Sequence, residues 1–510
     1  MGDRIYYDGG WLSQQGFMDL GPTFPSNATL SIDLTTSWFP DNASISAVEH
    51  PNQPTMEVQT IVTDQKSKCF YVWGGYSAYG IPIPDPREFW RFCASGGWQQ
   101  VELDLPSRIE FRRIPNLFFS ASASTHDTGF IFGGEASVSA LLPGDKKNFE
   151  GFLSFNFTSQ TWTSHDRPQD KPQYSSDGTL WGAKAIFVPN YGENGLIFFL
   201  GGSRGRGTGN VLYLDFNTVH FMDPVTKAWY KQSTTALNDN FPGPRHQHCI
   251  AGVAGENNTY EIYVFGGAND ASDFLPDSVH VLSLPSFTWS LVTKVDPEFV
   301  RENPNCAVVG NSQFLIWGGR TDGDSATRYG VQDPFKQGLG ILDLNTLRWK
   351  DEYNPDGAPY SPNHNVVLAR TSPPELSDEV RELFGSAVEP SSSDESPGAQ
   401  PEDQNDSESS STPVAAIAGG VVGGVALIAI TAGVYWFMSR RRRKVQAPVV
   451  QTSPNETVSK PPYEQVSPLD SAKPVEMSEL HELPRPVELG NGREGPKDVH
   501  EMDGSHARRP

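Results

Sequence analysis

The sequence is poor in cysteine, in cations and in apolar residues near its start. It has 4 Cys among 510 residues, too few to hold the chain together, so a folded core must come from apolar packing. Its 39 Lys+Arg against 61 Asp+Glu give a net charge of −22, which supplies no basic surface for phosphate, and no nucleic-acid partner is expected. The first residues, MGDRIYYDGGW, contain neither the apolar run nor the cleavage site of a signal peptide.

One long apolar run divides the chain. Val414–Met438 is 25 residues long and carries no charge, and as a helix rising about 1.5 Å per residue it would cross a hydrocarbon core of about 30 Å. Five cations follow at Arg440–Lys444, which predicts a cytoplasmic C-terminal side and contact with membrane lipid. We therefore expect residues 414–438 to be a transmembrane helix, residues 439–510 a disordered cytoplasmic tail, and the N-terminal part extracellular or lumenal.

The way in which the N-terminal part crosses the membrane stays open. Either an upstream signal peptide precedes Met1, or the span itself acts as the signal. Residues 371–413 are predicted to be an acidic linker rich in Ser and Pro. Two overlapping GxxxG patterns within the span would allow a homodimer. Sequons consistent with a glycoprotein lie before the span at Asn27, Asn42, Asn156, Asn257 and Asn405.

A short apolar and aromatic run ending in Gly-Gly recurs six times before the span. The pairs are Gly9 and Gly10, Gly74 and Gly75, Gly133 and Gly134, Gly201 and Gly202, Gly266 and Gly267, and Gly318 and Gly319. A tryptophan follows each pair by 22 to 30 residues, at Trp38, Trp98, Trp162, Trp229, Trp289 and Trp349. Each unit predicts a four-stranded antiparallel meander, with Gly-Gly ending its second strand and the tryptophan near its fourth. Sheets of this kind bury both faces when arranged radially, as in a propeller.

This pattern resembles the kelch-repeat family of β-propellers over residues 4–370. The fold class expected is therefore all-β, a six-bladed kelch-type propeller, followed by the transmembrane helix and the disordered tail. The whole layout is similar to that of single-pass membrane kelch proteins of filamentous fungi. One departure is Asp8, which replaces the apolar residue before the first Gly-Gly. Because the chain starts at a second strand, we expect Asn363–Arg370 to form a first strand and close the ring.

The segments between second and third strands are long, and they should share one face of the propeller. They are 76–88, 135–152, 203–218 and 320–338. Two interpretations are equally open: these loops form a ligand-binding face with the glycans of Asn156 and Asn257 on the opposite face, or they are tolerated insertions. The expected partner is a protein or glycan ligand of unknown identity.

No catalytic, cofactor-binding or metal-ligating residues are predicted. His246 and His248 have strand-alternate spacing but read as structural residues, because PRHQHC fits the usual first-strand phrase of kelch repeats. The TDGDS and SRGRGTG segments match calcium and phosphate loops only weakly. The main functional hypothesis is a non-enzymatic, membrane-anchored recognition or scaffold protein. The alternative is an extracellular carbohydrate-active enzyme, such as a copper radical oxidase that resembles galactose oxidase.

The four cysteines fall into two candidate pairs. Cys69 and Cys93 belong to one unit, and a disulfide between them is expected in an oxidising compartment. Cys249 and Cys306 lie on the first strands of consecutive units, and their pairing is left open.

Overall fold

The computed structural model describes the N-terminal part of the chain. The described residues are 1–13, 23–50, 56–77, 89–114, 116–137, 147–165, 172–174, 178–204, 211–269, 276–321 and 333–385. All of them belong to one compact unit, Met1–Ser396. Among them no helix has the length and apolar composition that crossing a bilayer requires. The predicted span Val414–Met438, the predicted tail and Asn405 lie outside the described residues.

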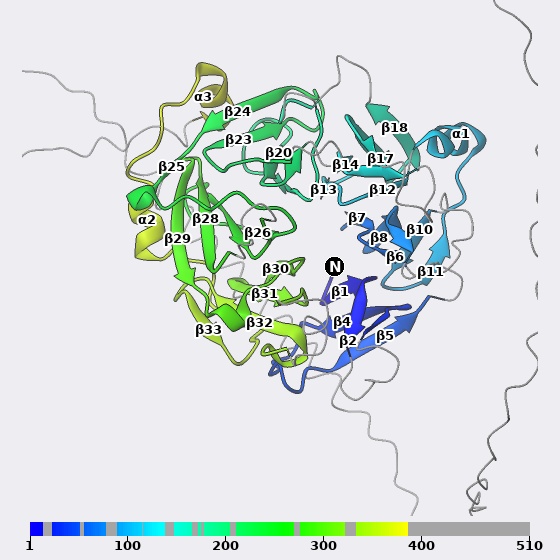
Figure 1. Ribbon diagram of the computed structural model, residues 1–510, viewed down its shortest axis with the longest axis horizontal. Coiled ribbons are helices and arrows are strands. Elements are labelled where there is room, and N and C mark those ends of the chain that lie inside the picture. Colours follow the sequence, from blue (N-terminus) through cyan, green and yellow to red (C-terminus); the bar gives the residue numbers. More distant parts are fainter. Residues whose placement is uncertain are drawn as a thin grey trace, which may run out of the picture. The chain divides into compact units, whose positions relative to one another are not determined.

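Six antiparallel sheets follow one another around a ring, and we call them blades 1 to 6 (Figure 1). Blade 1 contains β1 (Arg4–Asp8), β4 (Ala28–Asp33) and β5 (Ile45–Glu49). Blade 2 contains β7 (Thr60–Asp64), β8 (Cys69–Trp73), β10 (Trp90–Cys93) and β11 (Gly97–Gln100). Blade 3 contains β13 (Ala121–Ser124), β14 (Thr128–Phe132), β17 (Phe152–Asn156) and β18 (Thr161–His165).

The remaining three blades complete the ring. Blade 4 contains β19 (Lys184–Val188), β20 (Leu196–Leu200), β23 (Thr218–Met222) and β24 (Trp229–Ser233). Blade 5 contains β26 (Cys249–Ala254), β27 (Tyr260–Phe265), β28 (Ser278–Leu284) and β29 (Thr288–Lys294), with β25 (Thr235–Ala236) added beside β29. Blade 6 contains β30 (Asn305–Val309), β31 (Gln313–Trp317), β32 (Leu339–Asp343) and β33 (Arg348–Lys350). The prediction of an all-β six-bladed propeller is confirmed.

Shorter elements lie between the main strands. The short strands are β2 (Trp11–Ser13), β3 (Thr23–Pro25), β6 (Met56–Glu57), β9 (Tyr76–Ser77), β12 (Asn116–Phe118), β15 (Glu135–Ser137), β16 (Lys147–Asn148), β21 (Ser203–Arg204) and β22 (Leu212–Tyr213). The helices are α1 (Leu105–Arg113), α2 (His364–Ala369) and α3 (Asp378–Phe384), with 3-10 turns at Leu237–Asp239, Pro297–Phe299 and Lys336–Gly338.

The repeat tryptophans lie in the seams between blades, each against the blade before its own. Trp289 of blade 5 is fully buried and donates from Nε1 to the Phe216 carbonyl at 3.0 Å. Trp98 of blade 2 donates to Thr29 Oγ1 of blade 1 at 2.9 Å, and its ring is only partly buried. The other four make ring contacts in the same direction: Trp38 with Tyr353, Trp162 with Phe89, Trp229 with Phe132 and Trp349 with Phe265. Aromatic surface therefore joins neighbouring sheets all around the ring.

Both cysteine pairs are disulfides. Cys69 and Cys93 are opposite residues on neighbouring strands β8 and β10, with 4.1 Å between their Cα atoms. Cys249 and Cys306 join the innermost strands β26 and β30 of blades 5 and 6, with 5.8 Å between their Cα atoms. The first bond ties two strands within one blade, whereas the second ties two blades together.

The predicted closing strand at Asn363–Arg370 is wrong, because these residues form helix α2. The Asn363 side chain accepts a hydrogen bond from the Asn365 amide and caps the helix. Val366 and Ala369, three residues apart, are buried, while Val367 and Leu368 stay 43% exposed, which is helical periodicity. Figure 1 shows α2 on the rim beside β29 of blade 5, far from the innermost strands.

The folded unit also continues past the predicted boundary at residue 370. Helix α3 lies beside β24 of blade 4 (Figure 1), and its Val380 and Phe384 are buried in a cluster with Tyr191. We call residues 351–385 the C-terminal strap. It runs backwards along the ring, from blade 6 past blade 5 to blade 4, and Gly385 is its last described residue.

Candidate binding face

Each blade has two kinds of connections, and they emerge on opposite faces of the ring. We call the face where second strands end in Gly-Gly the long-loop face, because the segments between second and third strands start there. The opposite, short-loop face carries the turns between first and second strands and between third and fourth strands. The structure describes only the ends of the four long segments, since each contains residues outside the described ranges.

A collar of backbone bridges fixes the base of the long loops. In blades 2 to 6 the linker entering the blade pairs with the segment just after Gly-Gly. The pairs are Glu57 with Tyr76, Phe118 with Glu135, Trp181 with Ser203, His246 with Ala268 and Glu302 with Arg320. Loops on such a base have fixed ends, which is a common way to present variable binding segments on a rigid scaffold.

The repeat glycines lock each blade to the next one at this collar. The second glycine of a pair donates its amide to a carbonyl in the next blade's entering linker. The distances are 3.3 Å from Gly10 to Met56, 2.8 Å from Gly75 to Leu117, 2.6 Å from Gly134 to Leu180, 2.7 Å from Gly202 to Arg245 and 2.8 Å from Gly267 to Arg301. At Gly74, with φ +78°, an added Cβ would lie 2.2 Å from the Leu117 carbonyl oxygen, so glycine is required there.

Two arginines of the collar are buried and donate hydrogen bonds to backbone carbonyls. Arg245 is 1% exposed, and its Nε donates to the Gly243 carbonyl at 2.9 Å. Arg301 is fully buried, donates to the carbonyls of Glu298 and Val300, and pairs with Asp333 at 2.5 Å. Burial raises the pKa of the Asp333 carboxyl, although Arg301 opposes this shift. These guanidinium groups hold the collar together rather than face a ligand.

His246 and His248 do not share the face of a regular strand. Gln247, between them, has φ +54°, and strand β26 begins only at Cys249. The His246 ring packs against Trp181, with 4.8 Å between ring centroids, while the His248 ring lies near Phe216. Burial lowers the pKa of His248 well below its usual value, and the charges of Arg245 and Lys184 act in the same direction. An imidazole that stays neutral near Arg245 and Lys184 is consistent with a structural role for His248.

The junction of blades 6, 1 and 2 carries the more accessible polar groups of the collar. Trp11 Nε1 donates to Glu57 Oε2 at 2.6 Å, and Arg320 pairs with Glu302 Oε2 at 2.5 Å. Burial raises the pKa of Glu57, while the Trp11 hydrogen bond and the charge of Arg320 lower it by less. The Arg320 side chain is 33% exposed.

Blade 4 adds an apolar contribution to the same face. Val211 and Leu212, just before the third strand of that blade, are 38% and 52% exposed. Exposed apolar side chains beside long loops can provide contact area for a partner. On the short-loop face of the same blade, Val225 is 66% exposed, which gives a matched position for comparison.

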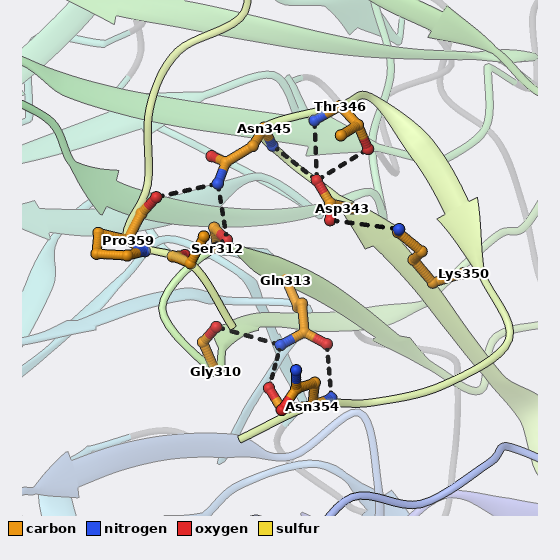
Figure 2. Close-up of polar contacts among 10 residues, drawn as sticks. Gly310, Ser312, Gln313, Asp343, Asn345, Thr346, Lys350, Asn354 and Pro359 are labelled. Atoms are coloured by element: carbon orange, nitrogen blue, oxygen red, sulfur yellow. Dashed lines mark hydrogen bonds and ion pairs between the residues drawn. The ribbon is translucent and has the colours of Figure 1, made fainter. Parts of the chain in front are cut away.

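The C-terminal strap covers the short-loop face of three blades. Figure 2 shows it on blade 6, where Gln313 Nε2 donates to the Asn354 carbonyl at 2.6 Å and Asn345 Nδ2 to the Pro359 carbonyl at 3.0 Å. On blade 5, Arg370 pairs with the buried carboxylate of Glu261. The described part of the strap therefore lies against the short-loop ends and the rim of blades 4 to 6.

The strap was missed by sequence reasoning, and so was the role of Asp8. This residue accepts from Thr29 Oγ1 at 2.7 Å and from Gln59 Nε2 at 2.6 Å, and its Oδ1 lies 2.8 Å from His50 Nε2. Both side chains of the Asp8–His50 pair are at most 2% exposed. A buried acid needs such partners, so the polar residue in an apolar run was a signal for a buried network.

The sequons occupy both faces. Asn42 and Asn257 lie in connections of the short-loop face, Asn156 is the last residue of β17 at that face, and Asn27 precedes the third strand of blade 1 on the long-loop face. Asn156 is partly buried and accepts from the Ser159 amide at 2.9 Å, whereas the other three are exposed.

The copper-oxidase alternative requires particular side chains, which can be compared with the described residues. They contain no group of three or more His, Cys, Asp or Glu side chains placed to hold a metal ion. The Tyr–Cys cross-link of a galactose-oxidase-type site needs a cysteine outside a disulfide, yet all four cysteines of the chain are paired. Most of SRGRGTG and TDGDS lies outside the described residues.

Known proteins match the repeat region. The model of the KLHDC2/KLHL20/DRC7 Kelch-repeats domain matches residues 193–372. A "Kelch repeat-containing protein" of Arthroderma benhamiae is 25% identical over 359 residues, which cover 67% of this chain and 46% of the relative. Kelch domain-containing protein 3 of Rattus norvegicus is 28% identical over 211 residues, which cover 39% of this chain and 47% of the relative.

The chain thus spans about half the length of these curated relatives. The matches and the six Gly-Gly blades agree on the same region. The N-terminal unit is a six-bladed β-propeller, and its residues 193–372 match a kelch-repeat domain.

Proposed function

We propose that this protein is a non-enzymatic recognition or scaffold protein that binds a protein or glycan ligand through the long-loop face of its propeller. The proposal rests mainly on a difference between the two faces of the propeller among the described residues. The strap occupies the short-loop face of blades 4 to 6, whereas the long-loop face of those blades carries the collar and the long connections.

We propose further that the propeller is tethered to a membrane of the secretory pathway, with the propeller outside or lumenal and the tail cytoplasmic. The chargeless run Val414–Met438 and the cations of Arg440–Lys444 support this topology. Two disulfides within the propeller support an oxidising compartment. Protease treatment of sealed membranes should leave the propeller intact and digest a tag placed after the tail. Digestion of the propeller from the cytoplasmic side would reverse the topology.

The long-loop face can be tested with one matched pair of positions in blade 4. A photo-crosslinking amino acid replaces Leu212 on the long-loop face or Val225 on the short-loop face of the full chain in its native cells. We expect partner crosslinks at position 212 and only background at position 225, because both sites are exposed but lie on opposite faces.

Substitutions provide the control for this experiment. Leu212→Asp should weaken the crosslinked complex by about tenfold, since a charge replaces apolar contact area, and Val225→Asp should leave it unchanged. Equal crosslinking from both faces, or equal loss in both variants, would contradict the proposal. Glycan-array binding with the same two variants identifies a carbohydrate ligand if no protein is crosslinked.

A further inference from the structure

Two helices of opposite charge lie on the outer rim of neighbouring blades. Helix α1 lies beside β18 of blade 3, and helix α3 lies beside β24 of blade 4. Figure 1 shows both helices outside the outermost strands, on adjacent stretches of the same rim. Neither helix belongs to the Gly-Gly repeat, so the repeat itself does not require either of them.

The outward side of α1 combines apolar and cationic side chains. Leu105 and Ile109 lie one turn apart and are 68% and 47% exposed. Arg108, Arg112 and Arg113 are also exposed, and with about 3.6 residues per turn they flank that apolar pair. We call these five residues the α1 face.

Local contacts satisfy these arginines only in part. Arg113 pairs with Glu110 at 3.7 Å, and its side chain stays 74% exposed. Arg108 donates to the Leu103 carbonyl at 3.0 Å, and Arg112 has no hydrogen bond or ion pair with a described residue. The α1 face is therefore cationic, on a chain whose net charge is −22.

The outward side of α3 has the opposite charge. The helix buries its apolar side in the cluster shared with blades 4 and 5, and it exposes Asp378, Glu379 and Glu382, which we call the α3 face. Its one cation, Arg381, pairs with Asp378 at 2.6 Å. Glu379 and Glu382 form no ion pair with a described residue. The α1 and α3 faces are therefore complementary in charge.

The helix dipoles explain only some of these charges. Cations in the last turn of α1 and acids in the first turn of α3 stabilise each helix on its own. Arg108, however, lies in the first turn of α1, and Glu382 lies in the last turn of α3, where the dipole disfavours their charges. The dipole also gives no reason for the exposed Leu105 and Ile109. A surface that covers both faces would account for all four residues.

We propose that two copies of this chain associate rim to rim, with the α1 face of each copy against the α3 face of the other. A two-fold axis midway between the two helices exchanges them, so the contact forms twice and the assembly closes as a dimer. Guanidinium and carboxylate groups form charge-assisted hydrogen bonds across such a contact, while Leu105 and Ile109 supply apolar area. The rim is separate from the long-loop face, and this association goes beyond the ligand binding proposed there.

The strength of this contact depends on how the copies are held. The contact is small and largely electrostatic, so we expect it to be weak between free copies. In the topology proposed above, both copies lie on one membrane, which raises their effective concentration. The association rests on that tether for its strength, and the protease assay tests the tether separately.

Photo-crosslinking on the full chain in its native cells tests the contact. Copies with two different tags are produced together. A photo-crosslinking amino acid replaces Ile109 or, as a control, Val48 on the outermost strand of blade 1, which is 41% exposed. We expect position 109 to give a product that carries both tags and is joined within residues 375–385, as mapped by mass spectrometry. Position 48 should give only background.

Charge reversal with a matched rescue tests the pairing of the two faces. Arg112→Glu with Arg113→Glu should lower the two-tag product at least about fivefold, because like charges then meet in both contacts. Glu379→Lys with Glu382→Lys should lower it by a similar factor for the same reason. Mixing copies of the two variants restores opposite charges at both contacts and should return at least about half of the product. This rescue also shows that both variants fold.

A charge reversal elsewhere on the rim controls for net charge. Arg348→Glu with Lys350→Glu, on the outermost strand of blade 6, should leave the two-tag product unchanged. Three results would overturn the proposal. The first is equal two-tag product from positions 109 and 48, which would indicate association through another part of the chain. The second is crosslinking of position 109 only to a different protein or to lipid, which would assign the α1 face to another partner. The third is the absence of rescue when the two charge variants are mixed.

Discussion

Blades 4 to 6 and blade 1 contain the same repeat but are stabilised differently. Blades 4 to 6 have four strands each, are braced on the short-loop face by the strap, and blades 5 and 6 are joined by the Cys249–Cys306 disulfide. Blade 1 has three described strands, and the described part of the strap meets it at Tyr353, which bridges to and stacks on Trp38 and donates to the Leu34 carbonyl. The repeat motif alone therefore does not determine which contacts outside the repeats brace a blade.

Buried polar contacts join blade 1 to blade 2. Asp8, His50, Thr29 and Gln59 join blades 1 and 2 with charge-assisted and neutral hydrogen bonds. Arg4 adds bonds to Ser31 and Asp33 on the neighbouring strand. Such networks fix geometry well but contribute less net stability than apolar burial of the same area.

The largest expected effect compares Gly74, where an added Cβ would meet a linker carbonyl, with Gly318, where no described backbone atom is among its nearest neighbours. Gly74 and Gly318 share a left-handed backbone, with φ of +78° and +71°, so alanine should cost each about 1–2 kcal/mol for conformation. Gly74→Ala also places Cβ 2.2 Å from the Leu117 carbonyl oxygen, and moving that linker should raise the total above about 4 kcal/mol. Urea unfolding of the two variants measures the difference. Equal losses would show that the linker contact does not decide the need for glycine.

The glycines and tryptophans could be predicted because both repeat at every blade. Gly-Gly requires backbone space, and tryptophan requires a seam, so six copies of one spacing indicate six equivalent environments. The Cys69–Cys93 pair followed from its place within one repeat. Asn363–Arg370 was misread because NVVLA is rich in β-branched residues, whereas tertiary packing of Val366 and Ala369 against blade 5 favours a helix.

The strap could not be predicted, because it belongs to no repeat. Its contacts are single anchors to distant residues, such as Tyr360 with Tyr263 at 2.9 Å and Gln232 with the Glu375 carbonyl at 2.9 Å. No local periodicity encodes such pairings. The acidic and proline-rich composition after residue 370 suggested a linker, although helix α3 has an N-cap at Ser377 and two buried apolar residues.

The second prediction compares two seam tryptophans. Trp289 is fully buried between blades 4 and 5, and Trp289→Ala should cost about 4 kcal/mol through lost burial and the cavity left behind. Trp98, between blades 1 and 2, is only partly buried, so Trp98→Ala should cost about half as much. Guanidinium unfolding of both variants gives the ratio. A larger loss at Trp98 would mean that blade 1 depends on its seam more than the strapped blades do.

The third prediction removes an anchor of the strap. Arg370→Leu leaves the carboxylate of Glu261 buried without its cation, which should cost about 3 kcal/mol and speed hydrogen exchange in α2 and α3. Arg381→Leu breaks the exposed pair with Asp378 in the same strap and should cost at most about 0.5 kcal/mol. The double variant Glu261→Gln with Arg370→Leu should recover part of the loss. If Arg370→Leu changes nothing beyond the Arg381 control, the strap does not depend on this pair.

The smallest expected effect is a pH dependence of the free energy of unfolding that comes from Glu261, the residue paired with Arg370 of the strap. Burial raises the pKa of Glu261 from 4.5 to about 7, although Arg370 opposes the shift. Between these values the folded state binds more protons than the unfolded state, so this residue's contribution makes stability fall as the pH rises from about 4.5 to 7 and level off above that. Glu261→Gln removes the titrating group, and the stability difference between variant and wild type should change by on the order of 2 kcal/mol across this window. Urea unfolding at about pH 5 and about pH 8, which enclose most of this window, measures the change. A constant difference would show that Glu261 titrates at its ordinary pKa and that the strap is held independently of pH.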